Sequence, residues 1–242
     1  MPTLPHFASA ESREDFLQVV PGVQRGLAEE QIVRLPCEIA PFDALLEGGW
    51  PRGRLSELYG TRSCGKTTLA LHLLAAVTRR GEMGVWIDAA NALHPLSLAA
   101  AGVELPRVLW VRPRSWQEAL RSAEIVLSSK GFALVVLDCG EQIPRWPSHG
   151  AWVRLQRAAA RAHAVLLLLT AQSLTGSFAT LRMRLQARKA RWVRVGQQAF
   201  LEGLQTVAVV ERNRTGSERQ QRCWEVGWQL AGNANWTVQA CG

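Results

Sequence analysis

The residues with the most specific chemistry lie at positions 60–67, where the sequence reads Gly-Thr-Arg-Ser-Cys-Gly-Lys-Thr. This spacing matches the phosphate-binding loop G-x-x-x-x-G-K-[ST], in which a tight turn points backbone N–H groups at phosphate oxygens. Lys66 would reach the outer phosphates of a nucleotide, and the Thr67 hydroxyl would hold Mg²⁺. The predicted nucleotide contacts are Gly60, Ser63, Cys64, Gly65, Lys66, Thr67 and Thr68. The alternative is a glycine-rich turn without a ligand, but an apolar stretch precedes the loop and a helical pattern follows it.

A carboxylate at the end of an apolar run could complete the metal site. Residues 132–138 read Phe-Ala-Leu-Val-Val-Leu-Asp, a continuous run typical of a buried parallel strand. Asp138 is therefore predicted to hold Mg²⁺ through water, as the second acidic motif of phosphate-loop proteins does. The alternative is an ordinary aspartate that caps a turn.

Short apolar strands alternate with amphipathic helices between residues 36 and 172. The predicted strands are 55–59, 85–88, 108–111, 132–138 and 164–170, and the predicted helices are 67–80, 115–130 and 150–163. This alternation predicts an α/β fold whose mainly parallel sheet is flanked by helices. Strands at 191–195, 206–212 and 222–228, joined by short turns, predict a C-terminal antiparallel extension.

We expect three parts in the chain: an N-terminal helical arm over residues 1–35, the phosphate-loop core over 36–215, and a C-terminal strand and tail over 216–242. Within the core, residues 173–190 are interpreted as a loop followed by a basic helical stretch. Arg184, Arg188 and Arg191 are spaced to share one helix face.

Basic charge is concentrated in one segment of the chain. The sequence holds 28 Lys and Arg against 20 Asp and Glu, a net charge of +8, and only three of the 28 are lysines. Ten basic and three acidic residues fall within 182–222, which points to a polyanionic partner, with single-stranded DNA the favoured form. The candidate DNA contacts are Arg182, Arg184, Arg188, Lys189, Arg191 and Arg194. The alternatives are a solvated face or a docking site for an acidic protein tail, and Trp192, which lies among these cations, is expected in the core.

Several classes of protein are disfavoured. The longest apolar runs are too short to span a membrane, and the N-terminal residues do not read as a secretory signal. Five cysteines, at positions 37, 64, 139, 223 and 241, include no C-x-x-C pair. This pattern disfavours a disulfide framework and predicts a reducing, cytoplasmic location.

Two longer segments carry a family resemblance. Residues 42–55 read Phe-Asp-Ala-Leu-Leu-Glu-Gly-Gly-Trp-Pro-Arg-Gly-Arg-Leu, and residues 87–95 read Ile-Asp-Ala-Ala-Asn-Ala-Leu-His-Pro. With the phosphate loop between them, they resemble the RecA recombinases, and the resemblance extends over about residues 36–215. It implies a RecA-like core that binds ATP with Mg²⁺.

The same resemblance suggests roles for three further residues. Gln172, after an apolar strand, is similar to the RecA glutamine that senses the nucleotide, and a polar strand end is the alternative. Arg212 and Arg214 are similar to two RecA basic residues that reach the phosphates of a neighbouring subunit. Their alternative role is to protect an edge strand from unwanted pairing.

The departures from RecA bear on catalysis. RecA carries a glutamate that activates the attacking water, and the matching position here is Ala90. Because general-base assistance contributes about 10²–10⁴-fold, the resemblance implies slow or absent hydrolysis, with Glu141 or Asp88 as alternative bases. His94 and Ser97 match the RecA positions that cradle adenine, which implies weaker base stacking.

A short, Arg-rich, RecA-like chain with this change resembles the ImuA family, the RecA- and SulA-like accessory proteins of bacterial mutagenic translesion synthesis. The resemblance implies a part in the SOS response to DNA damage, with ImuB and RecA as partners. It also implies an indirect link to the error-prone DNA polymerase III alpha subunit. The alternative function is a DNA-stimulated ATPase that acts as a small recombinase or modulates RecA filaments.

Overall fold

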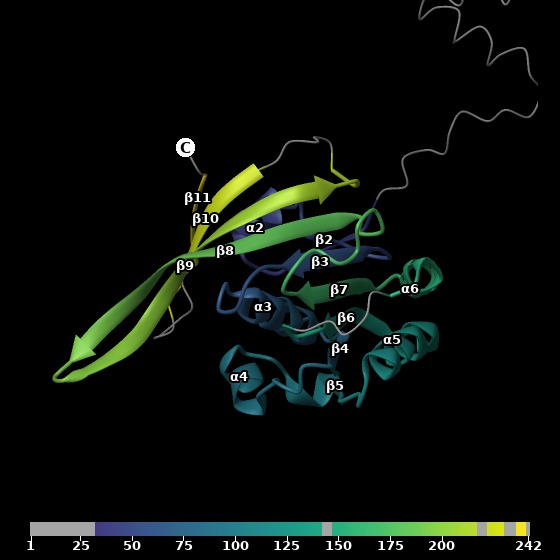
Figure 1. Ribbon diagram of the computed structural model, residues 1–242, viewed down its shortest axis with the longest axis horizontal. Helices are drawn as coiled ribbons and strands as arrows, with labels where there is room; N and C mark the ends of the chain where they lie inside the picture. The colour runs from purple at the N-terminus through teal and green to yellow at the C-terminus, as the bar shows by residue number, and fades with distance from the viewer. Residues whose placement is uncertain (1–31, 142–146, 217–221, 230–235, 241–242) are drawn as a thin grey trace, which may run out of the picture. The chain divides into compact units, whose positions relative to one another are not determined.

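In the computed structural model, strands from both halves of the chain join in one central sheet (Figure 1). They are β3 (Leu55–Tyr59), β4 (Met83–Asp88), β5 (Val108–Val111), β6 (Phe132–Asp138), β7 (Val165–Thr170), β8 (Leu181–Val195), β9 (Gln198–Asn213), β10 (Arg222–Gln229) and β11 (Trp236–Ala240). The structure describes residues 32–141, 147–216, 222–229 and 236–240, and within them nine strands follow the order β11-β10-β9-β8-β3-β7-β6-β4-β5. The strands from β8 to β5 are parallel and those from β8 to β11 are antiparallel. The predicted α/β class, with its antiparallel C-terminal extension, is confirmed.

Helices cover both faces of the parallel part of the sheet. They are α2 (Ala40–Leu45), α3 (Lys66–Arg79), α4 (Pro95–Ala100), α5 (Trp116–Ser129) and α6 (His149–Ala162), with a 3-10 turn, η1, at Leu105–Arg107. Strand β6 shows how the layers form. Leu134 and Val136 belong to the core cluster that contains α3, whereas Val135 and Leu137 belong to the cluster with α5 and α6. Both faces of β6 are thus buried, which explains its continuous apolar sequence.

Local signals in the sequence set the ends of α5 and α6. The Ser115 hydroxyl accepts a hydrogen bond from the Glu118 backbone N–H at 3.2 Å, and Ser148 caps α6 in the same way through Ala151. Lys130, the C-cap residue of α5, has a φ of 58°, so the helix ends at Ser129, one residue before the predicted end. A short antiparallel pair, β1 (Arg34–Leu35) with β2 (Trp50–Pro51), precedes β3.

The basic helical stretch predicted within residues 173–190 is wrong. Strand β8 begins at Leu181 and pairs in parallel with β3 and antiparallel with β9. The physical reason is a two-residue period: Leu181, Met183 and Leu185 are buried, while the arginines between them lie on the opposite face of the strand. The predicted shared helix face of Arg184, Arg188 and Arg191 therefore does not exist.

The outer parts of β8 and β9 form a long hairpin that extends past the other strands (Figure 1). Strand β3 pairs with β8 only through residues 181–184, and β10 pairs with β9 only through residues 203–210. Beyond these positions, in the described part of the chain, β8 and β9 pair only with each other. Trp192, expected in the core, is 61% exposed on it, so that prediction is wrong.

The described residues from Val33 onward belong to one compact unit. The N-terminal arm predicted over 1–35 falls mostly outside the described residues, although Arg34 and Leu35 form β1 and not a helix. In the described part of the chain, no helix is long and apolar enough to cross a membrane.

Candidate nucleotide site

The predicted phosphate loop connects β3 to α3. Ser63 and Gly65 adopt left-handed φ angles of 58° and 94°, and Gly65 is the N-cap residue of α3. No side chain caps α3, in contrast to α5 and α6. The first N–H groups of α3 and the positive end of its dipole are therefore available to an anion such as a phosphate.

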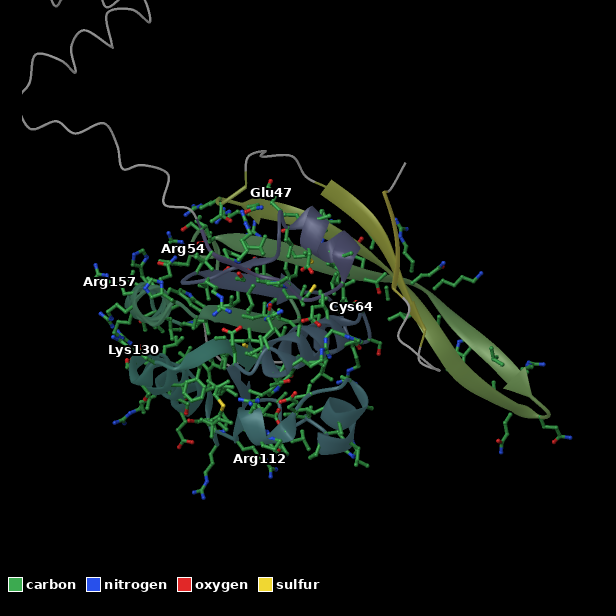
Figure 2. The ribbon with its side chains drawn as sticks, turned by 180° about the vertical axis from the view of Figure 1, so that it is seen from behind. Glu47, Arg54, Cys64, Arg112, Lys130 and Arg157 are labelled. Atoms are coloured by element: carbon green, nitrogen blue, oxygen red, sulfur yellow. The ribbon has the colours of Figure 1, made fainter. Side chains whose placement is uncertain are left out.

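Gly60 is required by the close approach of three segments. A Cβ atom added there would lie 2.2 Å from the Leu185 carbonyl oxygen on β8 and 2.8 Å from the Cys64 sulfur. The Gly60 N–H donates to the Thr170 carbonyl at the end of β7, at 3.2 Å. The Thr206 hydroxyl on β9 donates to the Cys64 carbonyl at 3.0 Å. The loop, where Figure 2 labels Cys64, thus packs against the base of the β8–β9 hairpin.

Lys66 begins α3 and is only 9% exposed. Its ammonium donates to the Gly60 carbonyl and lies 3.6 Å from the Glu141 carboxylate. The Cys64 thiol is buried, and burial raises its pKa, which makes it a poor nucleophile. Cys64 could therefore contact a nucleotide through its backbone N–H group and not through its thiol.

Asp138 ends β6 beside Asp88 on β4, its partner in the sheet register. Burial raises the pKa of Asp138 to about 6, and the negative charge of Asp88 also raises it. The Gly140 N–H, which donates to Oδ1 at 3.1 Å, lowers this pKa and so opposes the effect of burial. A carboxylate whose charged form the fold penalises, close to a buried lysine, is a candidate functional group. The uncapped helix, the Lys66 ammonium, the Thr67 hydroxyl at the start of α3 and this carboxylate fit a nucleotide with Mg²⁺.

The segment after β4 contains the positions where this chain departs from RecA. Asp88 Oδ1 accepts from the Ala92 N–H at 2.9 Å, and its Oδ2 accepts from the Leu93 N–H at 3.1 Å and the Trp110 indole at 3.3 Å. Asp88 therefore holds the turn that contains Ala90. His94 and Ser97, at the start of α4, are exposed.

Gln172 lies two residues past the end of β7, and its side chain is exposed. A pocket of about 410 Å³ adjoins this point; it is lined by Tyr59, Gly60, Thr61, Ala171, Arg184, Leu185, Gln186, Ala187 and Arg188. The start of the phosphate loop and the residue before Gln172 thus line the same pocket. The sensor role of Gln172 stays a prediction.

Arg212 and Arg214 are not brought to the phosphate loop of their own chain. Arg212, near the end of β9, pairs with Arg182 on β8, and Arg182 pairs with Glu57 in the middle of β3. The phosphate loop follows the end of β3. The Arg212 guanidinium donates to the Gly176 carbonyl at 2.8 Å. Arg214 is exposed. Contact with phosphates of a second subunit stays a prediction for both.

The six candidate DNA contacts divide into two groups. Arg182 and Arg184 form ion pairs with Glu211 at 3.2 and 3.3 Å, and Tyr59 donates to the same carboxylate at 2.7 Å. Arg188, Lys189 and Arg194 are exposed on the hairpin, and of Arg191 only the backbone on β8 is described. Arg188, Lys189 and Arg194 are therefore available for DNA contacts, whereas Arg182 and Arg184 are paired with Glu211.

A functional feature that sequence reasoning missed is Glu57, a fully buried carboxylate within β3. It accepts from the Leu174 and Thr175 N–H groups at 2.5 and 3.1 Å, and from the Thr175 and Ser173 hydroxyls at 2.6 and 3.2 Å. These bonds fix the loop that directly follows Gln172. The signal in the sequence is a glutamate within a short predicted strand, Leu-Ser-Glu-Leu-Tyr, because glutamate is rarely buried without partners.

Comparisons with known proteins agree with this geometry. The chain is 40% identical over 111 residues to "Protein RecA" of Lactobacillus delbrueckii subsp. bulgaricus, an alignment that covers 46% of this chain and 34% of the relative. It is 46% identical over 95 residues to "Protein RecA" of Limosilactobacillus reuteri, covering 39% and 26%. The chain thus spans about a third or less of the length of these curated relatives.

A solved structure with a similar fold is "Crystal structure of the RadB recombinase". It superposes with a TM-score of 0.60 at 21% identity and covers 78% of this chain and 94% of that chain. A family model described as the RecA N-terminal domain matches residues 30–150. Because that match spans half of the sequence, the chain belongs to the family of proteins with the RecA N-terminal domain.

Proposed function

We propose that this protein binds ATP with Mg²⁺ at the 60–67 loop and binds single-stranded DNA through the β8–β9 hairpin. The observation that supports this most directly is the packing of the loop on the base of the hairpin, through Gly60 against Leu185 and Cys64 against Thr206. A nucleotide at the loop would press on the same two strands that present the exposed cations. Nucleotide binding and DNA binding would therefore be coupled.

The outer hairpin has the chemistry of a single-strand binding surface. Arg188, Lys189 and Arg194 supply exposed positive charge, and Trp192 supplies an exposed aromatic ring. Cations that follow a phosphate backbone, together with an aromatic on which bases stack, are the usual elements of such surfaces. The pairing of β8 with β9 holds these side chains in a fixed order. Figure 2 shows the outer hairpin extending away from the other described elements.

Within this proposal, nucleotide mainly controls conformation and assembly. Ala90 has no proton acceptor, so turnover would be slower than that of a recombinase. The matching biological role is that of an ImuA-type accessory subunit, which links DNA, ImuB and RecA during SOS-induced translesion synthesis. An error-prone DNA polymerase III alpha subunit would be reached indirectly through ImuB. The motifs around the phosphate loop and the change at Ala90 support this assignment.

The DNA surface is tested by charge reversal on the hairpin. A triple variant with Arg188→Glu, Lys189→Glu and Arg194→Glu should weaken binding of a fluorescent oligothymidylate. For three lost phosphate contacts, the slope of log K against log salt should fall by about 2. The matched control reverses two arginines and one lysine on other exposed positions, Arg114, Arg121 and Lys130. Equal effects of the two triple variants would refute a specific hairpin surface.

The partner assignment is tested separately with the folded, full-length chain. Pull-downs with ImuB and with RecA should succeed for wild type, with and without an ATP analogue. Lys66→Ala should reduce any binding that depends on nucleotide, since the lysine would contact its outer phosphates. Wild type that binds neither protein under any nucleotide condition would exclude the accessory role, although DNA binding would stand.

A further inference from the structure

We propose that Glu141 is the general base for the hydrolysis of ATP at this site. The inference rests on the proposed nucleotide binding at the 60–67 loop. Glu141 is the third residue after Asp138, and its side chain is 38% exposed. Its carboxylate lies 3.6 Å from the Lys66 ammonium, so it is already beside the group that would contact the outer phosphates.

The backbone around Glu141 explains how its side chain comes to this point. Gly140 has a φ of 67°, and a Cβ atom added to it would lie 3.0 Å from the Ala90 Cβ. The Ala89 N–H donates to the Asp138 carbonyl at 3.1 Å. The turn after β6 therefore packs directly on the turn after β4. The absence of a side chain at Gly140 permits this approach, and Glu141 is the next residue along that turn.

The other nearby carboxylates in the described part of the chain are occupied by hydrogen bonds, by ion pairs or by the proposed metal role. Both oxygens of Asp88 accept hydrogen bonds within its own turn. Glu57 is fully buried with four donors, and Glu211 is held by Tyr59, Arg182 and Arg184. Asp138 stands where Mg²⁺ would be held. Glu141 combines partial exposure with a position next to Lys66, and a water molecule can reach it.

The chemical step is an in-line displacement at the terminal phosphate. When Lys66 turns to the phosphates, the Glu141 carboxylate is left facing the terminal phosphoryl group, and a water between them separates the two negative groups. That water forms the new bond to phosphorus while the bond between phosphorus and the bridging oxygen breaks, and the electron pair leaves with ADP. The water proton passes to Glu141, which later releases it to solvent.

The test compares wild type, Glu141→Gln, Glu141→Asp and the control Glu104→Gln. Glu104 lies in a surface ion pair with Arg107, away from the phosphate loop. Affinity for a fluorescent non-hydrolysable ATP analogue is measured first, and then single-turnover hydrolysis of labelled ATP with single-stranded DNA present. Glu141→Gln should bind the analogue as well as wild type or more tightly, since a negative charge beside the phosphates is removed. Its hydrolysis should fall by about 10²-fold or more.

The partial and control variants sharpen the result. Glu141→Asp should keep an intermediate rate, because the carboxylate is retained but withdrawn by one methylene, and Glu104→Gln should match wild type. Hydrolysis by Glu141→Gln at the wild-type rate or faster would overturn the proposal. Wild type that binds the analogue but does not hydrolyse ATP would overturn it as well. Loss of analogue binding by Glu141→Gln would make Glu141 a binding residue, whereas failure of wild type to bind would refute the proposed nucleotide site itself.

Discussion

Replacement of Asp138 by asparagine should stabilise the folded chain while it weakens Mg²⁺-dependent nucleotide binding. Asp138 is buried at the end of β6, and burial raises its pKa from the ordinary 3.8 to about 6. That difference corresponds to about 3 kcal/mol by which the fold disfavours the charged form. Asparagine has nearly the same shape and keeps an oxygen for the Gly140 N–H, but it carries no charge.

The raised pKa of Asp138 determines how its effect on the stability of the folded chain changes with pH. Between pH 3.8 and about 6 the folded chain retains a proton on Asp138 that the unfolded chain has released, so this group lowers stability as the pH rises. Above pH 6 the penalty is present in full. The advantage of Asp138→Asn should be small near pH 4 and reach roughly 1–3 kcal/mol at pH 7.5, since the new amide N–H₂ offsets part of the gain.

The assay is urea unfolding followed by tryptophan fluorescence at pH 4.5 and 7.5, in EDTA and without nucleotide. Asp43→Asn is a contrasting control, because both Asp43 oxygens accept backbone N–H bonds, from Cys37 and Glu38, and this variant should be destabilised. The reasoning is refuted if Asp138→Asn is no more stable than wild type at pH 7.5. It is also refuted if the difference between the two proteins does not grow with pH. Binding of a fluorescent ATP analogue with Mg²⁺ should be weaker in the variant under the same conditions.

Three further predictions concern single side chains. Glu57→Gln should lower the free energy of unfolding by roughly 1–3 kcal/mol in urea titrations. The reason is that one carboxylate oxygen, which accepts hydrogen bonds from the loop after Gln172, becomes an N–H₂ group. An unchanged unfolding midpoint would contradict the role of Glu57 in holding this loop. Ala90→Glu should raise the rate of ATP hydrolysis at least about tenfold in a phosphate-release assay, because it adds a second carboxylate in the adjacent turn; no gain would mean that this position does not face the terminal phosphate. The Cys64 thiol should resist iodoacetamide in the folded protein and react in urea, as mass spectrometry of the 60–67 peptide would show, since it is 1% exposed and its pKa is raised. Rapid labelling of the native chain would show that the loop opens.

Local signals predicted much of the fold. Strands β3, β5 and β6 have the predicted bounds, and α5, with Ser115 as its N-cap, lies within one residue of the helix predicted over 115–130. These predictions succeeded because each depends on neighbouring residues alone: an apolar run for a buried strand, a hydroxyl for a helix start. The prediction of a helix before residue 190 failed because basic residues at positions 184, 188 and 191 imitate helical spacing. The buried side of β8 instead follows the period of two set by Leu181, Met183 and Leu185.

Taken by itself, the sequence determined the α/β class, the position of the 60–67 motif between a strand and a helix, and the position of Asp138 at the end of β6, because spacing along the chain is enough to define each of them. The tertiary structure alone decided which cations are available. Glu211, distant in sequence, pairs with Arg182 and Arg184, while Arg188, Lys189 and Arg194 remain exposed on the hairpin. It also decided that Glu141 lies beside Lys66 and that Asp88 is committed to its own turn. Such contacts depend on how strands and turns pack in space, and linear spacing does not encode which side chains that packing brings together.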